Sequence, residues 1–321
     1  MSGEFDLIRK YFAEATGPRD DVVLGIGDDC ALLKVPPGRQ LAVSLDTLVC
    51  GRHFVADADP ESLGHKALAV NLSDLAAMGA EPAWVTLGIT LPEADEAWLA
   101  AFMRGFAALA AEHGVQLVGG DTTRGPLSIT VQVHGFIEPG RALRRDSAKV
   151  GDLVYVSGTL GDAGLALLAQ QGLYVRAGSM PGLRQRLDRP TPRVALGLAL
   201  REFASAAIDL SDGLGSDLGH ICERSGVGAL LYLENLPVSE AVQDYVQETG
   251  DWSLPLSSGD DYELAFCIPA GRQAAFEAAS AAWDVPVSWV GMIERGKGVR
   301  AMQPDGQFSD NVAGGYDHFR D

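Results

Sequence analysis

Short motifs that combine aspartate with glycine or a hydroxyl residue recur along this sequence. They read GIGDDCALL at 25–33, SLDTL at 44–48, NLSD at 71–74, GGDTT at 119–123 and IDLSDG at 208–213. Aspartate and hydroxyl oxygens are hard ligands that suit Mg²⁺, and Mg²⁺ in turn suits phosphate groups. The motifs therefore predict an enzyme that binds metal ions and handles phosphate.

A plain turn is the alternative reading of each motif, because aspartate hydrogen-bonds its own backbone and glycine tolerates a positive φ. That alternative stays open for Asp28 and Asp29. Asp46 fits it less well, since it falls on a predicted strand, where aspartate is disfavoured. Asp74 falls in the middle of an apolar helix face beside Val70, where a carboxylate must be paired or must hold a cation. Five such motifs in one chain make chance turns an inadequate account.

The elements that would position the first motifs follow from hydrophobic periodicity. Strands are predicted at 22–27, 41–46, 85–91, 116–118 and 127–134, and helices at 4–15, 62–78 and 94–112. Leu41, Val43 and Leu45 would face the core, which leaves Ser44 and Asp46 on the opposite face of the strand. Asn71 and Asp74 are three residues apart and would project from one side of their helix.

A domain boundary is predicted at RALRRDSAKVG (141–151), which is charged and has no periodicity. The chain would then form two domains, 1–148 and 149–321. In the second, strands are predicted at 153–156, 208–211, 230–233, 262–268 and 287–290, helices at 165–171, 193–203, 216–224 and 273–283, and irregular chain at 173–192. Without strict strand-helix alternation, this order predicts two mixed α+β domains rather than one doubly wound sheet.

Composition limits the class of protein. The chain has 321 residues, 47% of them hydrophobic, which suits two globular domains. A net charge of −18 argues against nucleic-acid binding, so bound Mg²⁺ is the simplest way to neutralise phosphate ligands. No apolar run suggests a membrane span or a secretory signal, and the cytoplasm is the expected location. The four cysteines form no CxxC pair and are expected to be reduced and buried.

Three further segments leave alternatives open. GTLGDAG (158–164) loosely matches a nucleotide-binding loop, but a plain turn from strand to helix is favoured. The P-loop and the protein-kinase motifs do not occur, so ATP binding would need another design. SGDDYEL (258–264) fits either a polar turn or a site, and AGGYDHF (313–319) suggests a segment that docks back onto the body.

A family resemblance is carried by longer versions of these motifs. GIGDDCALL, SLDTLVCGRHF, GHKALAVNLSDLAAMGAEP, GGDTTRGP, AIDLSDGLGSDLGH, SGDDYEL and GGYDHF follow one another over nearly the whole chain. In this order they resemble the thiamine-monophosphate kinases, members of an ATP-binding superfamily with aminoimidazole ribonucleotide synthetase, selenophosphate synthetase and a hydrogenase maturation protein.

The resemblance implies a fold and an activity. The fold would be a two-domain α+β homodimer whose N-terminal domains share a barrel, with ATP and several Mg²⁺ ions in the cleft between the domains. The C-terminal domain would complete the active site. The activity would be ATP-dependent conversion of thiamine monophosphate to thiamine diphosphate by direct in-line transfer, the last step of thiamine diphosphate biosynthesis.

The resemblance also implies roles for single residues. Mg²⁺ would be held by Asp29, Ser44, Leu45, Asp46, Asp74, Asp121, Asp209 and Asp212, while a role for Asp28 stays open. Asp46, Asp74, Asp121 and Asp212 would be catalytic. ATP would contact Gly120, Asp121, Arg145 and Ser211, and thiamine phosphate would contact His53, Asp260 and Tyr316.

The sequence departs from the family pattern at two of these positions. Leu45 replaces a common threonine, so that only its carbonyl could be a ligand, and GDDYEL replaces GEDYEL.

Other members of the superfamily are the nearest alternatives. Selenophosphate synthetase would need a reactive cysteine near the N-terminus after a glycine-rich lead, whereas the first cysteine here is Cys30. The hydrogenase protein would end in a cysteine-bearing tail, whereas this sequence ends in HFRD. A non-catalytic nucleotide sensor would lack some of the carboxylates, and none is missing.

Overall fold

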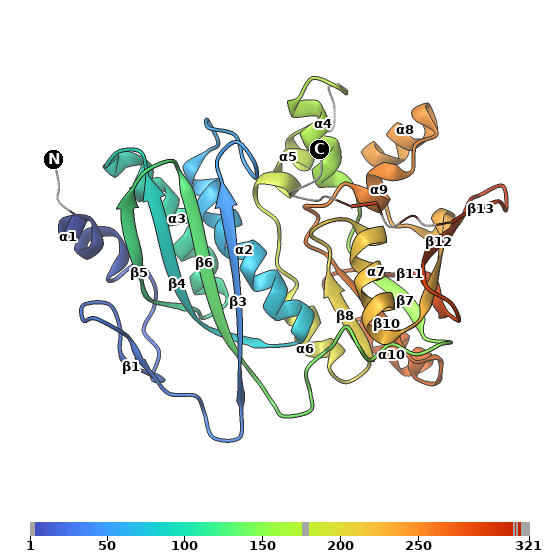
Figure 1. Cartoon of the computed structure of the whole chain (residues 1–321), viewed down its shortest axis with the longest axis horizontal. Coiled ribbons are helices and arrows are strands. Elements are labelled where there is room, and N and C mark those ends of the chain that lie inside the picture. The colour runs from blue at the N-terminus through green and yellow to red at the C-terminus, as the bar shows by residue number, and fades with distance from the viewer. Residues whose placement is uncertain (1–3, 175–179, 311, 313, 316–321) are drawn as a thin grey trace. The chain divides into compact units, whose positions relative to one another are not determined.

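The computed structural model describes residues 4–174, 180–310, 312, 314 and 315. Its internal contacts divide the chain into two compact units, one made of residues 1–75 and 80–142 and the other of 76–79 and 143–321. The first unit contains a four-stranded sheet and the second a seven-stranded sheet (Figure 1). The mixed α+β fold expected from the sequence is confirmed, and in the described part of the chain no sheet closes into a barrel.

The first unit is a sheet covered on one face by two helices (Figure 1). Its strand order is β3-β6-β4-β5, and β4 pairs parallel with β5 while the other pairs are antiparallel. The strands are β3 (Gln40–Val49), β4 (Glu81–Leu91), β5 (Gln116–Arg124) and β6 (Ser128–Ile137), and the helices are α2 (Pro60–Met78) and α3 (Glu96–Glu112). A small β1 (Val22–Leu24) and β2 (Leu32–Leu33) pair and a short N-terminal helix, α1 (Glu4–Leu7) with a π turn at Ile8–Phe12, complete the unit.

Glycine lets the two covering helices approach closely. A Cβ on Gly64 of α2 would lie 1.9 Å from the Phe102 carbonyl oxygen, and one on Gly105 of α3 would lie 1.8 Å from that of Glu61. No larger residue fits at either position without moving a helix. The close crossing buries Phe102 and Phe106 against the sheet and holds α2 in a fixed position over β3.

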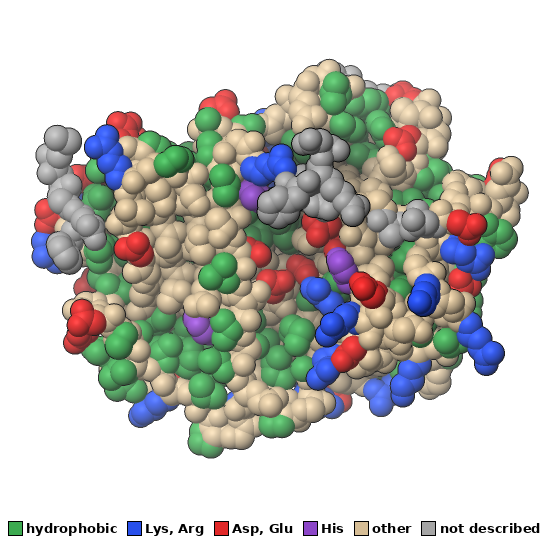
Figure 2. All heavy atoms as spheres, in the orientation of Figure 1, with side chains coloured by type: hydrophobic (Ala, Val, Ile, Leu, Met, Phe, Trp, Pro, Cys, Tyr) green, Lys and Arg blue, Asp and Glu red, His purple; other side chains and the backbone are tan. Residues whose placement is uncertain are grey.

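The faces of β3 are the reverse of those predicted. Leu41, Val43 and Leu45 are 45%, 51% and 53% exposed, while Ser44 and Asp46 lie on the side of the sheet that carries α2. The physical reason is that α2 presents polar side chains to this edge of the sheet, so the polar face of the strand packs inward. Figure 2 shows hydrophobic side chains gathered on the open face of the sheet.

The second unit is built on a sheet of strand order β13-β12-β9-β11-β7-β10-β8. All its pairs are antiparallel except β9 with β12. The strands are β7 (Leu153–Ser157), β8 (Ala206–Asp209), β9 (Gly228–Tyr232), β10 (Leu264–Ile268), β11 (Val287–Glu294), β12 (Gly298–Met302) and β13 (Phe308–Ser309). The helices are α4 (Asp162–Gln170), α5 (Met180–Asp188), α6 (Val194–Leu200), α7 (Leu214–Ser225), α8 (Glu240–Thr249), α9 (Ser253–Ser257) and α10 (Gln273–Ser280), with short 3₁₀ turns at Leu233–Asn235 and Ala270–Arg272.

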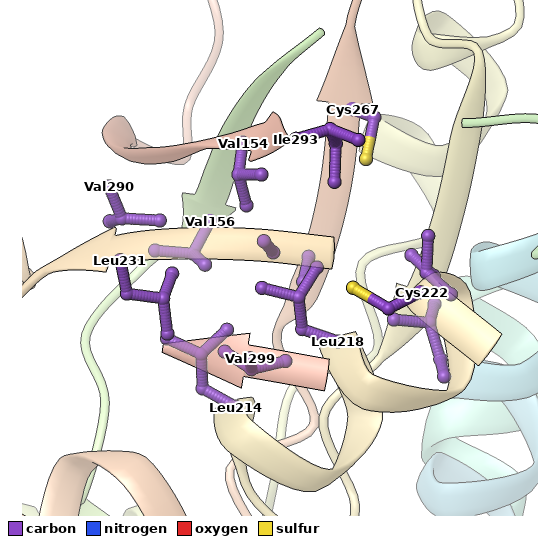
Figure 3. Packing of buried hydrophobic residues seen from close by; sticks show 14 of the residues in the cluster. Val154, Val156, Leu214, Leu218, Cys222, Leu231, Cys267, Val290, Ile293 and Val299 are labelled. Atoms are coloured by element: carbon purple, nitrogen blue, oxygen red, sulfur yellow. The ribbon is translucent and has the colours of Figure 1, made fainter. Parts of the chain in front are cut away.

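The core of this unit forms where α7 packs on the sheet. Leu214, Leu218 and Cys222 of α7 meet strand residues such as Val156 and Leu231 (Figure 3). Cys222 and Cys267 belong to this cluster, whereas Cys30 is exposed and Cys50 half-buried, so the expectation that all four thiols are buried is wrong for Cys30. Within the described residues, no helix is long and apolar enough to cross a membrane.

Several elements differ from those predicted. Helix α5 lies inside the stretch expected to be irregular. Leu183 and Leu187 are buried, but two leucines in a mainly polar sequence make an apolar pattern too weak to predict a helix. Strands β12 and β13 and helices α8 and α9 were not predicted. The N-terminal helical region ends at Phe12 rather than Ala15.

Candidate active site

A strand and a helix of the first unit bring several of the motif residues together. The Ser44 hydroxyl of β3 donates a 2.5 Å hydrogen bond to Oδ2 of Asp74 on α2. The Asp46 N–H donates to Oδ1 of Asn71 at 3.0 Å, and Nδ2 of Asn71 donates back to the Ala67 carbonyl within α2. Asn71 and Asp74 therefore project from one side of their helix, as predicted. Through its two hydrogen bonds, Asn71 links the backbone of β3 to α2.

The local sequence explains this placement. Leu68, Leu72 and Leu75 fill the apolar stripe of α2, which leaves the adjoining stripe of Asn71 and Asp74 for the edge strand. Buried amides and carboxylates need hydrogen-bond partners, and β3 supplies them from a hydroxyl and a backbone N–H. The result brings the Ser44 hydroxyl to the Asp74 carboxylate, with Asp46 two residues further along the same face of β3.

The GGDTT motif lies in β5, at the edge of the sheet opposite β3. Gly120 has φ +155°, and a Cβ there would lie 1.9 Å from the Leu87 carbonyl oxygen of β4. Asp121 pairs with Gly88 and is exposed. Gly120 therefore lets β5 stay paired with β4 while the chain delivers Asp121 to the surface.

Gly120→Ala is expected to destabilise the first unit by about 1–3 kcal/mol, because the new methyl group overlaps the Leu87 carbonyl. Gly119→Ala is the matched control, since a Cβ there meets only the Thr86 methyl group at 3.9 Å. Urea unfolding of both variants measures the difference. Equal midpoints for the two would contradict the steric argument.

Two other predicted residues of the first unit have local structural partners. The Asp29 N–H donates to Oδ1 of Asp28 at 2.8 Å, which is the turn contact considered as an alternative for this pair, and both side chains are exposed. The ring of His53 is half-buried, and its Nδ1 accepts the Val49 N–H at 3.0 Å at the end of β3. Leu45 points its side chain toward the open face of the sheet.

The IDLSDG motif of the second unit forms the end of β8 and the turn into α7. Asp209 is buried, and Ser211 and Asp212 are half-buried. The side chain of Asp217, in the first turn of α7, accepts the N–H groups of Asp212 and Gly213 at 3.0 and 3.1 Å. Asp217 thus fixes the backbone that carries Asp212.

Asp217 is a residue that the sequence analysis missed. It is 2% exposed, and burial raises its pKa to about 8, opposed by the hydrogen bond from the Asp212 N–H and reinforced by the negative charges of Asp209 and Asp212. The available signal was an aspartate in the first turn of a helix that follows SDG. Three carboxylates therefore influence one another around this turn.

The SGDDYEL segment packs directly on the same turn. The Asp260 N–H donates to the Ser211 carbonyl and the Tyr262 N–H to the Leu210 carbonyl, both at 2.9 Å. Two motifs that are distant in the sequence therefore meet, which the sequence alone did not establish. Asp260, predicted to contact substrate, lies beside Ser211, predicted to contact ATP.

The remaining predicted residues are placed less completely. Gly314 and Gly315, the two described residues of the AGGYDHF segment, lie near Ser257 and Ser216, respectively, of the second unit. Tyr316 lies outside the described residues. Arg145 is exposed, and its carbonyl accepts the Ser225 hydroxyl at 2.7 Å.

Glu263 of the SGDDYEL segment is the centre of a buried ionic network. Glu263 is 0% exposed and accepts hydrogen bonds from Arg193, from Arg186 at 2.7 Å and from the Ser157 hydroxyl at 2.6 Å. Burial alone would raise the pKa of Glu263, but the hydrogen bond and charge of Arg193, followed by Arg186 and Ser157, lower it below its ordinary value. This network was not predicted from the sequence, because both arginines come from segments distant from Glu263 in the chain.

Comparison with protein families identifies both halves of the chain. Residues 27–137 match the AIR synthase related protein, N-terminal domain, and residues 149–303 match the corresponding C-terminal domain. The first match includes the SLDTL, NLSD and GGDTT motifs, and the second includes IDLSDG and SGDDYEL.

Individual proteins match over nearly the full length. The chain is 51% identical over 320 residues to the thiamine-monophosphate kinase of Salmonella typhimurium, covering 99% of this chain and 98% of that protein. The crystal structure of thiamine-monophosphate kinase from Stenotrophomonas maltophilia is 50% identical with a TM-score of 0.84, covering 90% of this chain and 92% of that one. A structure described as AaThiL complexed with AMPPCP and TMP is 34% identical with a TM-score of 0.76, covering 92% of each chain.

Proposed function

This chain belongs to the thiamine-monophosphate kinase family, and we propose that it transfers the terminal phosphoryl group of ATP to thiamine monophosphate, giving ADP and thiamine diphosphate. The observation that carries the proposal is the likeness over 92% of the chain to a relative described in complex with AMPPCP and TMP. In this role the enzyme would complete the synthesis of thiamine diphosphate.

The oxygen donors of both units suit Mg²⁺. Ser44 and Asp74 offer a hydroxyl and a carboxylate in one strand-helix contact, and Asp46 lies on the same face of β3 as Ser44. Among the described residues, no three acidic, histidine or cysteine side chains are grouped so as to enclose a metal ion. Mg²⁺ commonly binds one or two carboxylates and completes its shell with water and substrate phosphates, and the Asp74 carboxylate beside the Ser44 hydroxyl could serve as such a ligand.

Metal binding would extend to other residues of the same motifs. In the first unit Asp29, Asp121 and the Leu45 carbonyl would assist, and in the second Asp209 and Asp212. When bound, Mg²⁺ would neutralise phosphate charge and orient the transferred group. That role explains how a chain of net charge −18 can bind polyanions.

The residues of the chain then have mainly to bind and to orient. The acceptor phosphate has a second pKa of about 6 and is already ionised at neutral pH, so no general base is needed. Gly120, Asp121, Arg145 and Ser211 would hold ATP for in-line transfer. His53, Asp260 and Tyr316 would hold thiamine phosphate, with Tyr316 facing the cationic thiazolium ring.

A coupled ADP assay tests the proposal. Thiamine monophosphate, free thiamine and aminoimidazole ribonucleotide precursors are offered in parallel, each with ATP and Mg²⁺. We expect ADP formation with thiamine monophosphate alone, and thiamine diphosphate as the second product. Turnover of free thiamine without turnover of its monophosphate would overturn the proposal.

A homodimer is proposed on the exposed face of β3. Leu41, Val43 and Leu45 form an apolar stripe on an edge strand, and such patches mark association surfaces. A second copy of the chain would cover this stripe and complete a shared barrel. Light scattering should give twice the chain mass of 33.9 kDa, and a monomer mass at micromolar concentration would contradict this part of the proposal.

A further inference from the structure

The turn that carries Asp260 has an unusual backbone. Asp260 and Tyr262 have φ values of +63° and +49° and are the two non-glycine residues with positive φ among those described. Gly259 before them has φ +66°. Side chains disfavour this region, so the turn persists only because its surroundings impose it. Such strain is typical of functional sites, which raises the question of what holds the turn.

Hydrogen bonds to the IDLSDG segment hold one side of the turn. The Asp260 N–H is bonded to the Ser211 carbonyl and the Tyr262 N–H to the Leu210 carbonyl. Between these two residues, the side chain of Asp261 points away into the protein, where it is 6% exposed. Its Oδ2 accepts the Gly161 N–H at 2.8 Å.

The partner of Asp261 belongs to the glycine-rich GTLGDAG turn. Gly161 has φ +84° and precedes α4, where a free N–H would be available to a phosphate ligand. Asp261 occupies that N–H instead. The glycine-rich turn therefore serves as an anchor for the SGDDYEL segment, which answers the open question about its role.

The neighbouring charged groups compensate little of the negative charge that Asp261 carries when ionised. Arg186 and Arg193 both bond to Glu263, and Asp162 accepts the hydroxyls of Thr159 and Ser239 at 2.5 Å. Among the residues that the structure describes, Oδ1 of Asp261 has no hydrogen-bond partner. Burial raises the pKa of Asp261 to about 7, opposed by the Gly161 hydrogen bond and by Arg186 and reinforced by Asp162 and Glu263.

We propose that Asp261 is a positioning residue that holds Asp260 in the geometry needed to bind thiamine phosphate, through its buried contact with Gly161. This inference rests on the proposed function, because it assumes that Asp260 contacts that substrate. Asp261 itself is buried and accepts the Gly161 N–H, so it would act on the substrate through Asp260. Its effect should therefore appear in the KM for thiamine phosphate and not in the KM for ATP.

Two substitutions separate positioning from a merely structural role. Asp261→Ala removes the acceptor for the Gly161 N–H, and we expect the KM for thiamine phosphate to rise about tenfold or more while the KM for ATP stays within about twofold. Asp261→Asn keeps an acceptor oxygen and mimics the neutral acid, so its KM at pH 6 should match that of the wild type. Cys267→Ala, a buried change in the core of the same unit, is the control and should alter stability but neither KM.

The pH dependence gives a readout that survives if Asp261→Ala does not fold. As the pH rises from 6 to 8.5, Asp261 ionises, and its buried charge has little compensation, which should loosen the turn that carries Asp260. The asparagine variant cannot ionise and should not show this effect. Titration of the substrate phosphate affects both enzymes equally and cancels in their ratio. The KM for thiamine phosphate of the wild type, divided by that of Asp261→Asn, should therefore rise across this range.

The outcomes distinguish this inference from the proposed function. A wild-type enzyme that does not turn over thiamine phosphate overturns the proposed function and this inference with it. An active wild type whose KM ratio to Asp261→Asn stays flat from pH 6 to 8.5 overturns the positioning role alone. A folded Asp261→Ala variant with an unchanged KM for thiamine phosphate does the same.

Discussion

Asp74→Asn is expected to lower Mg²⁺-dependent ADP formation by about 100-fold or more while the protein keeps its fold. Asparagine retains an oxygen that can accept the Ser44 hydroxyl, so the contact between β3 and α2 survives. What is lost is a negative charge that would hold a metal ion, and metal stabilisation of a transition state is worth several kcal/mol. The coupled assay across a magnesium series measures the loss.

The matched control for this variant is Asp57→Asn, which removes an exposed carboxylate shortly before α2. It should leave both the turnover number and the magnesium dependence unchanged. Circular dichroism and the melting temperature confirm that each variant is folded. Turnover of Asp74→Asn equal to that of the wild type at every magnesium concentration would remove the metal assignment.

Glu263→Gln is expected to reduce the free energy of unfolding by about 3–5 kcal/mol, the usual cost of breaking a buried ion pair from one side. Glutamine would leave the charge of Arg193 without its buried counter-ion, and Arg186 would keep only its longer contact of 3.7 Å to Asp162. The control is Glu294→Gln, whose partner Arg300 is partly exposed. That substitution should cost no more than about 1 kcal/mol, because solvent screens the pair.

The pH dependence of this difference has a definite sign. Because the pKa of Glu263 is lower in the folded than in the unfolded chain, its stabilisation is present above the ordinary value of 4.5 and is lost as the pH falls through the folded value. Urea unfolding at pH 7 and pH 4 should therefore show a smaller gap between wild type and Glu263→Gln at the lower pH. A gap that widens in acid would contradict the role of the ion pair.

The sequence predicted those elements whose pattern is long and regular. Helices α2 and α3 and strands β4 and β6 were predicted near their observed bounds, because each is a long segment of regular composition or periodicity. The same method misjudged the faces of β3. Periodicity shows that apolar Val43 and polar Ser44 lie on opposite faces of the strand, but it does not state which face packs on a helix.

The candidate site was predictable as a set of residues but not as a geometry. Asn71 and Asp74 share a helix face by spacing alone, whereas the meeting of Asp260 with Ser211 depends on long-range strand pairing. Asp217 and Glu263 were missed because their importance lies in burial, and burial is a property of the folded chain. A carboxylate read from the sequence gives no sign of whether water or an arginine surrounds it.

The strand order of the second unit has a consequence for how the chain folds. β7 lies inside the sheet and pairs with β10 and β11, and the pairing of Val156 with Ala265 closes a loop of roughly 100 residues. Pairings so distant in the sequence form slowly, because the entropy of loop closure is lost before the contacts are gained. During synthesis, β7, β8 and β9 emerge before β10 and β11 exist, so the unit must fold late. Until then its apolar strands are exposed and prone to aggregation.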